Sequence, residues 1–184
     1  VLLCGEDHRS KSSVSPGTSD WALRSSLVPI FYPASVAEII ELGMHAVHLS
    51  RWLGVVTAMK LVTPVCDGGS TIDLARTRVM PQRPAQYNKR LHPIVMALGA
   101  LPMQQELVET KVPLIEAYIR DNHLNRVHWS DASGPVGIVT SGKSFVDVDQ
   151  ALQLLGTRVP TLHLRVSWPL DAEGIRRFAT EQGL

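Results

Sequence analysis

Residues 137–144 of the sequence are Gly137-Ile138-Val139-Thr140-Ser141-Gly142-Lys143-Ser144. It matches, letter for letter, the phosphate-binding P-loop pattern, in which two glycines enclose four residues and Lys and Ser or Thr follow. In a P-loop the strand precedes the first glycine, and the enclosed residues form a loop whose backbone N–H groups point at phosphate. Here the preceding run, residues 129–135, consists mainly of turn-forming residues, and the apolar segment 136–140 lies inside the motif. We therefore predict a buried strand, a turn at Ser141-Gly142 and a helix from Ser144 to Leu155, with a nucleotide-binding module as the alternative.

This strand, turn and helix also resemble part of a known family. Followed by Asp147-Val148 and Gln150-Ala151-Leu152, they resemble the start of the transketolase C-terminal-like domain in indolepyruvate ferredoxin oxidoreductases. These enzymes belong to the thiamine-diphosphate-dependent 2-oxoacid:ferredoxin oxidoreductases. Further segments resemble the family's second strand, in Val166-Ser167-Trp168-Pro169-Leu170, and the end of its pyrimidine-binding domain, in Gly5-Glu6-Asp7-His8, Lys11-Ser12-Ser13 and Tyr32-Pro33-Ala34-Ser35. The resemblance covers most of the chain, is weakest from about residue 73 to 104, and depends on the order and spacing of these segments.

The resemblance implies an α/β fold made of parallel-sheet, three-layer α/β/α units. Residues 1–75 would form the C-terminal part of a pyrimidine-binding-like domain, residues 76–134 a linker with a helix, and residues 135–184 the start of a transketolase C-terminal-like domain. We expect the two β-α-β units to contribute to separate sheets of a longer polypeptide. Alone, the segment would leave strand edges uncovered and would self-associate, because open edges pair with other chains.

The resemblance also implies an activity. The parent enzyme would oxidatively decarboxylate indolepyruvate or another arylpyruvate to the acyl-CoA and pass the electrons to ferredoxin, using thiamine diphosphate, Mg and iron–sulfur clusters. This sequence contains neither a Gly-Asp-Gly motif nor a C-x-x-C pair, and we find no match to the family's activating glutamate. We therefore expect an inactive segment without catalytic or metal-binding residues, which forms one wall of the site. Its expected partners are the other domains or subunits of an oligomeric enzyme, ferredoxin and coenzyme A.

Composition excludes several other classes of protein. The 184 residues are 45% hydrophobic and 19% charged, which is ordinary for a globular protein with a real core. The formal net charge of +1 gives no reason to expect nucleic acid or a membrane as partner, and no apolar run reaches the ~20 residues that span a bilayer. Cys4 and Cys66 cannot form a framework of disulfides, which favours a reducing, cytoplasmic setting.

The candidate site follows the first predicted strand, Val1 to Gly5. A polar loop, residues 6–17, comes next, and in open α/β sheets ligands lie beyond the carboxyl ends of the strands. Read from the residues alone, a solvated surface loop is the favoured interpretation. The resemblance places the loop near substrate and cofactor, and it makes these the candidate residues: Glu6, Asp7, His8, Ser12 and Ser13.

The clearest predicted helix begins at Ser35, where Ser35-Val36-Ala37-Glu38 is a capping box, and ends at Gly54. Its apolar stripe is expected at Val36, Ile39, Ile40, Met44, Val47 and Leu53. His45 and His48 are three residues apart, as in a metal-binding pair, but no third ligand is visible, so a polar helix face is favoured. Lys60, in the predicted strand 55–62, could contact an anion, although a lysine extending to solvent at a sheet edge is the favoured interpretation.

The remaining elements follow the same patterns. We expect a short helix capped by Thr18 or Ser19, a strand at 28–32, another at 70–74 and a basic linker over 75–90. A helix at 104–123 that Pro113 could kink, a strand at 162–166 and a helix capped by Asp171 complete the chain. A non-catalytic α/β interaction domain remains the third functional alternative.

Overall fold

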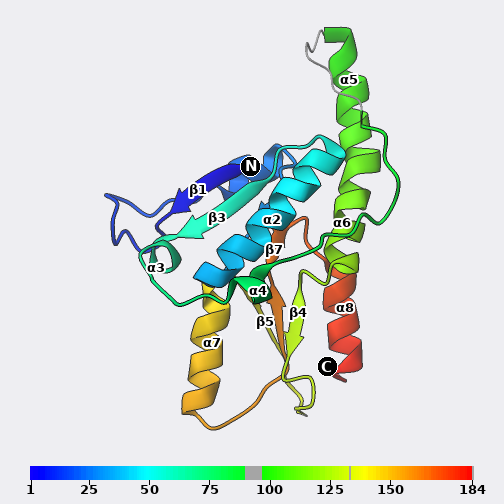
Figure 1. The fold of residues 1–184 in the computed structure, drawn as a ribbon. Helices are drawn as coiled ribbons and strands as arrows, with labels where there is room; N and C mark the ends of the chain where they lie inside the picture. The colour runs from blue at the N-terminus through cyan, green and yellow to red at the C-terminus, as the bar shows by residue number, and fades with distance from the viewer. Residues whose placement is uncertain (90–96, 133, 184) are drawn as a thin grey trace.

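The computed structural model describes residues 1–89, 97–132 and 134–183, which form two β-sheets with helices packed against them (Figure 1). The larger sheet has the strand order β1-β3-β2-β7 and the smaller one β4-β6-β5. The predicted α/β class is confirmed. None of the described helices is long and apolar enough to cross a bilayer.

Three of the four strands of the larger sheet come from the first part of the chain. Its strands β1 (Leu2–Glu6), β2 (Ile30–Phe31) and β3 (Ala58–Val62) are parallel, as the β-α-β order predicts. β3 lies in the middle, so four of its five residues are buried. Helix α1 (Asp20–Ser25) follows β1 in the chain. The long helix α2 (Val36–Leu53) connects β2 to β3 and packs across one face of the sheet (Figure 1).

Helix α2 has the predicted ends. Ser35 Oγ accepts a hydrogen bond from Glu38 N at 3.3 Å, and Gly54 ends the helix with φ of 65°. The Glu38 side chain instead accepts from Ala34 N, one residue earlier than in a standard capping box. The predicted apolar stripe is wrong by part of a turn: Met44 is 38% exposed, and the buried face consists of Leu42, His45, Ala46, Leu49, Trp52 and Leu53.

The connection between the two sheets runs over the surface of α2 and a later helix. It contains two short helices, α3 (Thr63–Cys66) and α4 (Leu74–Thr77), so the strand predicted at 70–74 is wrong. Asp73 Oδ1 accepts from Ala75 N and begins α4, and this local competition with strand formation is typical of aspartate. Lys89 Nζ donates to Arg51 O at 2.5 Å. Arg90, the end of the predicted basic linker, lies outside the described residues.

The predicted helix at 104–123 is longer and is interrupted. It consists of α5 (Ala97–Glu106), a π-helical turn η1 (Leu107–Lys111) and α6 (Val112–Asp121). Pro113 lacks a backbone N–H, and in a regular α-helix its ring would collide with the carbonyl four residues before it. Pro113 therefore explains why the turn just before it widens to a π-helix. Ile115, Tyr118 and Ile119 of α6 pack with α2 in the main core.

The smaller sheet contains β4 (Arg126–His128), β5 (Ile138–Ser141) and β6 (Thr161–Leu164), covered by α7 (Lys143–Leu154) and α8 (Ala172–Glu181). Asp171 caps α8 as predicted, accepting from Gly174 N at 2.9 Å. Strand β4 was not predicted, because three residues show too little alternation to be recognised.

The single strand predicted at 162–166 is in fact two strands. β6 pairs with β5 in the smaller sheet, whereas β7 (Val166–Trp168) pairs with β2 in the larger one, and Arg165 lies between them. The expectation that the two halves of the chain contribute to separate sheets is therefore wrong for β7. The division into domains at residues 75 and 134 remains a prediction.

Candidate functional site

The loop after β1 lies where the sequence places it, at the carboxyl end of the parallel strands. It borders a cavity of about 530 Å³ whose other walls come from the ends of β3 and α3. The predicted residues Glu6, Asp7, Ser12 and Ser13 all line this cavity, and His8 lies just outside it. Their role in binding substrate or cofactor stays a prediction.

Asp7 organises the loop. Its Oδ2 accepts from Ser12 N at 2.5 Å and from Ser13 Oγ at 3.2 Å, which folds residues 7–13 around one carboxylate. The backbone N–H of Ser12, followed by those of Lys11 and Arg9 and the Ser13 hydroxyl, holds the Asp7 pKa below its usual value. Ser12 and Ser13 themselves are exposed and face the cavity from this turn.

Glu6, by contrast, is buried, with a side chain only 2% exposed. Its Oε1 accepts from Ser19 N at 2.7 Å and from Ser19 Oγ at 2.5 Å, and its Oε2 lies 3.1 Å from Lys60 Nζ. Burial raises the pKa of Glu6, but the hydrogen bonds from Ser19 and the ion pair with Lys60 outweigh it and lower the pKa overall. His8 Nδ1 is 3.7 Å from the same Oε2.

Lys60 lies in the middle of the sheet and not at its edge. Its Nζ is 2.5 Å from Asp20 Oδ2 and lies 4.9 Å from the centre of the Tyr32 ring. The interpretation as a lysine extending to solvent is therefore wrong, because the strand order that buries β3 cannot be read from β3 itself. Burial lowers the pKa of Lys60, yet Asp20 and Glu6 raise it overall, so the lysine is held as a cation between two carboxylates.

The P-loop pattern does not form a P-loop. Strand β5 lies inside the motif, as predicted, Ser144 Oγ donates back to Ser141 O at 2.7 Å, and Lys143 contacts Asp147 of its own helix. Gly142 has a different reason to be glycine: its φ is 53°, and an added Cβ would lie 2.3 Å from the Tyr32 ring. The glycine thus permits the close approach of the two sheets rather than the approach of a phosphate.

The two histidines of α2 face a tyrosine. His45 Nδ1 lies 2.9 Å and His48 Nδ1 3.2 Å from Tyr118 Oη, and His45 is buried, so the predicted polar face is wrong for this residue. Burial lowers the pKa of His45 to about 4. Within the described ranges, no three His, Cys, Asp or Glu side chains are grouped as metal ligands would be.

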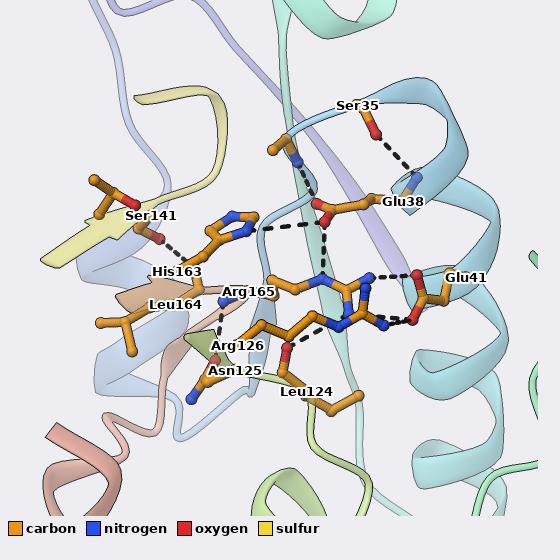
Figure 2. A network of polar contacts seen from close by, with 12 residues as sticks. Ser35, Glu38, Glu41, Leu124, Asn125, Arg126, Ser141, His163, Leu164 and Arg165 are labelled. Atoms are coloured by element: carbon orange, nitrogen blue, oxygen red, sulfur yellow. Dashed lines mark hydrogen bonds and ion pairs between the residues drawn. The ribbon is translucent and has the colours of Figure 1, made fainter. Parts of the chain in front are cut away.

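Sequence reasoning missed the network that joins the two sheets, which Figure 2 shows from close by. Arg165 is fully buried, and its guanidinium lies between two carboxylates of α2, with Nε 2.9 Å from Glu38 Oε1 and Nη2 2.6 Å from Glu41 Oε2. Burial raises the Glu41 pKa, but the hydrogen bond and charge of Arg165 outweigh it, so the pKa is lowered. Arg126 adds a second contact to Glu41 at 2.6 Å.

The backbone around Arg165 is held as firmly as its side chain. Asn125 Oδ1 accepts from Arg165 N at 2.9 Å and from Val166 N at 3.3 Å, and Tyr32 N donates to Arg165 O at 2.8 Å. The chain therefore passes from one sheet to the other at a residue whose backbone N–H and C=O are both hydrogen-bonded and whose guanidinium is paired with two carboxylates. The only indication of this network in the sequence was an arginine, Arg165, within an apolar strand pattern.

Comparisons with known proteins place this arrangement in a class. A solved structure of a 2-oxoglutarate:ferredoxin oxidoreductase from Magnetococcus marinus, with 2-oxoglutarate, coenzyme A and succinyl-CoA bound, matches 97% of this chain with a TM-score of 0.60. The sequence identity is 13%, so this likeness shows the fold alone. The match covers 39% of the Magnetococcus marinus chain. The architecture thus resembles that of one segment of this 2-oxoglutarate:ferredoxin oxidoreductase. No protein-family model matches the sequence.

The sequence is similar to one particular subunit. The indolepyruvate oxidoreductase subunit IorA of Methanothermobacter marburgensis is 28% identical over 184 residues, and that of Archaeoglobus fulgidus is 25% identical over 185. These alignments cover 97% and 98% of this chain but 29% of each relative, so the chain spans less than a third of their length. The resemblance seen in the sequence is confirmed: nearly the whole chain is similar to one segment of these subunits.

Proposed function

We propose that this chain is part of an indolepyruvate:ferredoxin oxidoreductase, which oxidatively decarboxylates indolepyruvate or another arylpyruvate to the acyl-CoA and reduces ferredoxin. The observation that carries the proposal is the similarity to IorA subunits along the whole chain. The fold shared with a 2-oxoacid:ferredoxin oxidoreductase supports it. We place the enzyme in the cytoplasm, as an oligomer with its remaining domains or subunits, with coenzyme A and ferredoxin as partners.

The residues of this segment do not fit the cofactors of such an enzyme. Two cysteines are fewer than the four thiolates that hold an iron–sulfur cluster, and the described residues contain no group of metal-ligating side chains. Thiamine diphosphate, Mg and the clusters would be held elsewhere in the protein, and we derive no chemical step through them. Under this proposal the isolated segment is inactive.

What this segment would contribute is one wall of the site. The loop 6–17 is folded around Asp7, and buried Glu6 lies beneath it, paired with Lys60 and bonded to Ser19. These bonds fix the loop at the carboxyl end of β1 before any ligand arrives, which lowers the entropic cost of binding. Ser12 and Ser13 would then present hydroxyl and backbone groups to the substrate or cofactor.

The test is an activity assay on the full-length protein together with its partner subunits. Indolepyruvate, phenylpyruvate, pyruvate and 2-oxoglutarate are each offered with coenzyme A, and reduction of ferredoxin is followed. Arylpyruvate-dependent reduction is expected. Reduction with 2-oxoglutarate alone would retain the class but reject the substrate, and no reduction with any 2-oxoacid would reject the enzyme in favour of a non-catalytic domain.

A variant pair tests the role of the loop. Asp7→Asn weakens the acceptor that organises residues 7–13 and should raise KM or lower kcat, because the loop loses its preorganisation. Asp131→Asn is the matched control: this carboxylate is 74% exposed, and its ion pair with Arg158 is 3.6 Å long. Equal kinetics in both variants would show that the loop does not border the reaction.

A further inference from the structure

A second cavity lies beside the loop after β1, on the side facing α7. Its volume is about 700 Å³, and its walls come from three distant parts of the chain: the loop, Tyr32 after β2, and the first turn of α7. Val62 and Pro64 at the end of β3 also line it. It therefore occupies the carboxyl edge of the parallel strands, where ligands of open α/β sheets bind.

Basic side chains reach this cavity from two walls. Arg9 and Lys11 come from the loop, and Lys143 comes from α7. The cavity owes this convergence to the packing of the two sheets, because Gly142 lets α7 begin directly against the Tyr32 ring. Residues that are more than 130 positions apart in the sequence thus line one space.

The two carboxylates of the cavity are already engaged. Asp7 accepts from Ser12 N, Ser13 Oγ and the backbone N–H groups of its own loop, which leaves it little capacity to pair with a cation. Asp147 contacts Lys143 in an i,i+4 pair whose side chains are 62% and 30% exposed. Such a pair contributes only about 0.3–0.5 kcal/mol, so a ligand can replace it readily.

Arg9 is the group with unused capacity. Among the residues that the structure describes, no carboxylate lies within ion-pair distance of its guanidinium, while Lys11 has a distant contact with Asp67 at 3.9 Å. A guanidinium offers a fork of N–H groups that matches two oxygens of one phosphate or carboxylate. A lysine on the opposite wall supplies a point charge.

We propose that this cavity binds a phosphate group, with Arg9 contacting two of its oxygens from the loop and Lys143 contacting it from α7. Arg9, Lys11 and Lys143 outnumber the carboxylates Asp7 and Asp147, so the lining favours an anion. The phosphate is either free or the end of a larger ester, whose body would lie against Tyr32 and Val62. This cavity adjoins the one assigned to the oxidoreductase and shares Asp7 with it, but Arg9 and Lys143 line only this second cavity, so the inference does not depend on that assignment.

The test uses inorganic phosphate as the probe and the melting temperature of the full-length protein as the readout, at constant ionic strength. A ligand that binds the native state raises its stability in proportion to the logarithm of its concentration over Kd. Phosphate should stabilise the wild type, and Arg9→Gln with Lys143→Gln should weaken the apparent affinity at least about tenfold. Both residues are at least partly exposed, so the double variant should keep the wild-type near-ultraviolet circular dichroism.

Two controls sharpen the outcome. Arg158→Gln removes an exposed arginine of the loop between α7 and β6, which does not line the cavity, and should leave phosphate stabilisation unchanged. Glycerol phosphate distinguishes the sources: tighter binding than inorganic phosphate indicates an ester, and weaker binding indicates the free ion. No stabilisation by either anion, or equal stabilisation of the wild type and the double variant, would overturn the proposal.

Discussion

Replacing Arg165 by Met tests whether the charged network holds the two sheets together. Arg165 is fully buried, and the carboxylates that neutralise it, Glu38 and Glu41, have side chains only 16% and 15% exposed. Methionine fills much of the same volume without charge, so the variant leaves two nearly buried carboxylates facing an apolar chain. Arg126 still contacts Glu41, and Glu38 still accepts from Ala34 N.

The size of the effect follows from these partners. Removing one member of a buried ion pair costs about 3–5 kcal/mol, and the contacts that remain place this case near the lower end, at about 3 kcal/mol. Because each 1.4 kcal/mol is a factor of ten, local opening at the joint should become on the order of 100 times more frequent.

Hydrogen–deuterium exchange of the full-length protein measures this opening directly. Peptides covering β6, β7 and α2 should exchange faster in Arg165→Met, while Arg158→Met, which removes an exposed ion pair, should not change them. Adding Glu38→Gln and Glu41→Gln to Arg165→Met should restore most of the protection, because removing the whole set of buried charges costs far less than isolating part of it. Wild-type exchange at these peptides in Arg165→Met would refute the reasoning.

Three further results are expected. Gly142→Ala places a Cβ against the Tyr32 ring at a position with positive φ, and it should lower the free energy of unfolding by about 2–4 kcal/mol. Gly156→Ala is the control: its φ is 62° but its surroundings are open, so it should lower the free energy of unfolding by only about 1 kcal/mol. Equal shifts in melting temperature would contradict this. Lys143→Ala should change stability by no more than about 0.5 kcal/mol in urea titrations, because among the described residues its ion pair is the i,i+4 contact with Asp147 on its own helix; a larger loss would show a structural role. Stability should fall between pH 6.5 and 5, because burial lowers the pKa of His45 to about 4 and that of His163 to about 3. The unfolded chain therefore takes up protons first as the pH falls, which costs about 2 kcal/mol of stability for each histidine at pH 5. His163→Gln should remove roughly half of that loss, and an unchanged slope would show another origin.

The carboxylates with lowered pKa values do not interfere with that pH window. Glu6 and Glu41 stabilise the fold above their ordinary pKa and lose this contribution only as the pH falls below about 4.5. Most of the stability loss caused by the two histidines occurs at pH values above those at which Glu6 and Glu41 protonate. A decline confined to pH values below 4.5 would therefore point to these acids and not to the histidines.

The sequence by itself determined the local features. The ends of α2 at Ser35 and Gly54, the Asp171 cap of α8 and the strand within the P-loop pattern were all predicted, because capping, glycine at positive φ and apolar runs act over a few residues. The polar loop after β1 was also placed at the correct edge of the sheet, since the order β-α-β requires it.

Only the tertiary structure decided which polar side chains are buried and with what. Arg165 and Glu41 are 124 residues apart, and nothing near either of them indicates that they meet. Lys60 was misplaced because its burial depends on the strand order, in which β1 and β2 enclose β3. The strand at 162–166 was predicted as one element because its two halves share one apolar pattern, while their partners in two different sheets are set by long-range pairing that a local pattern does not contain.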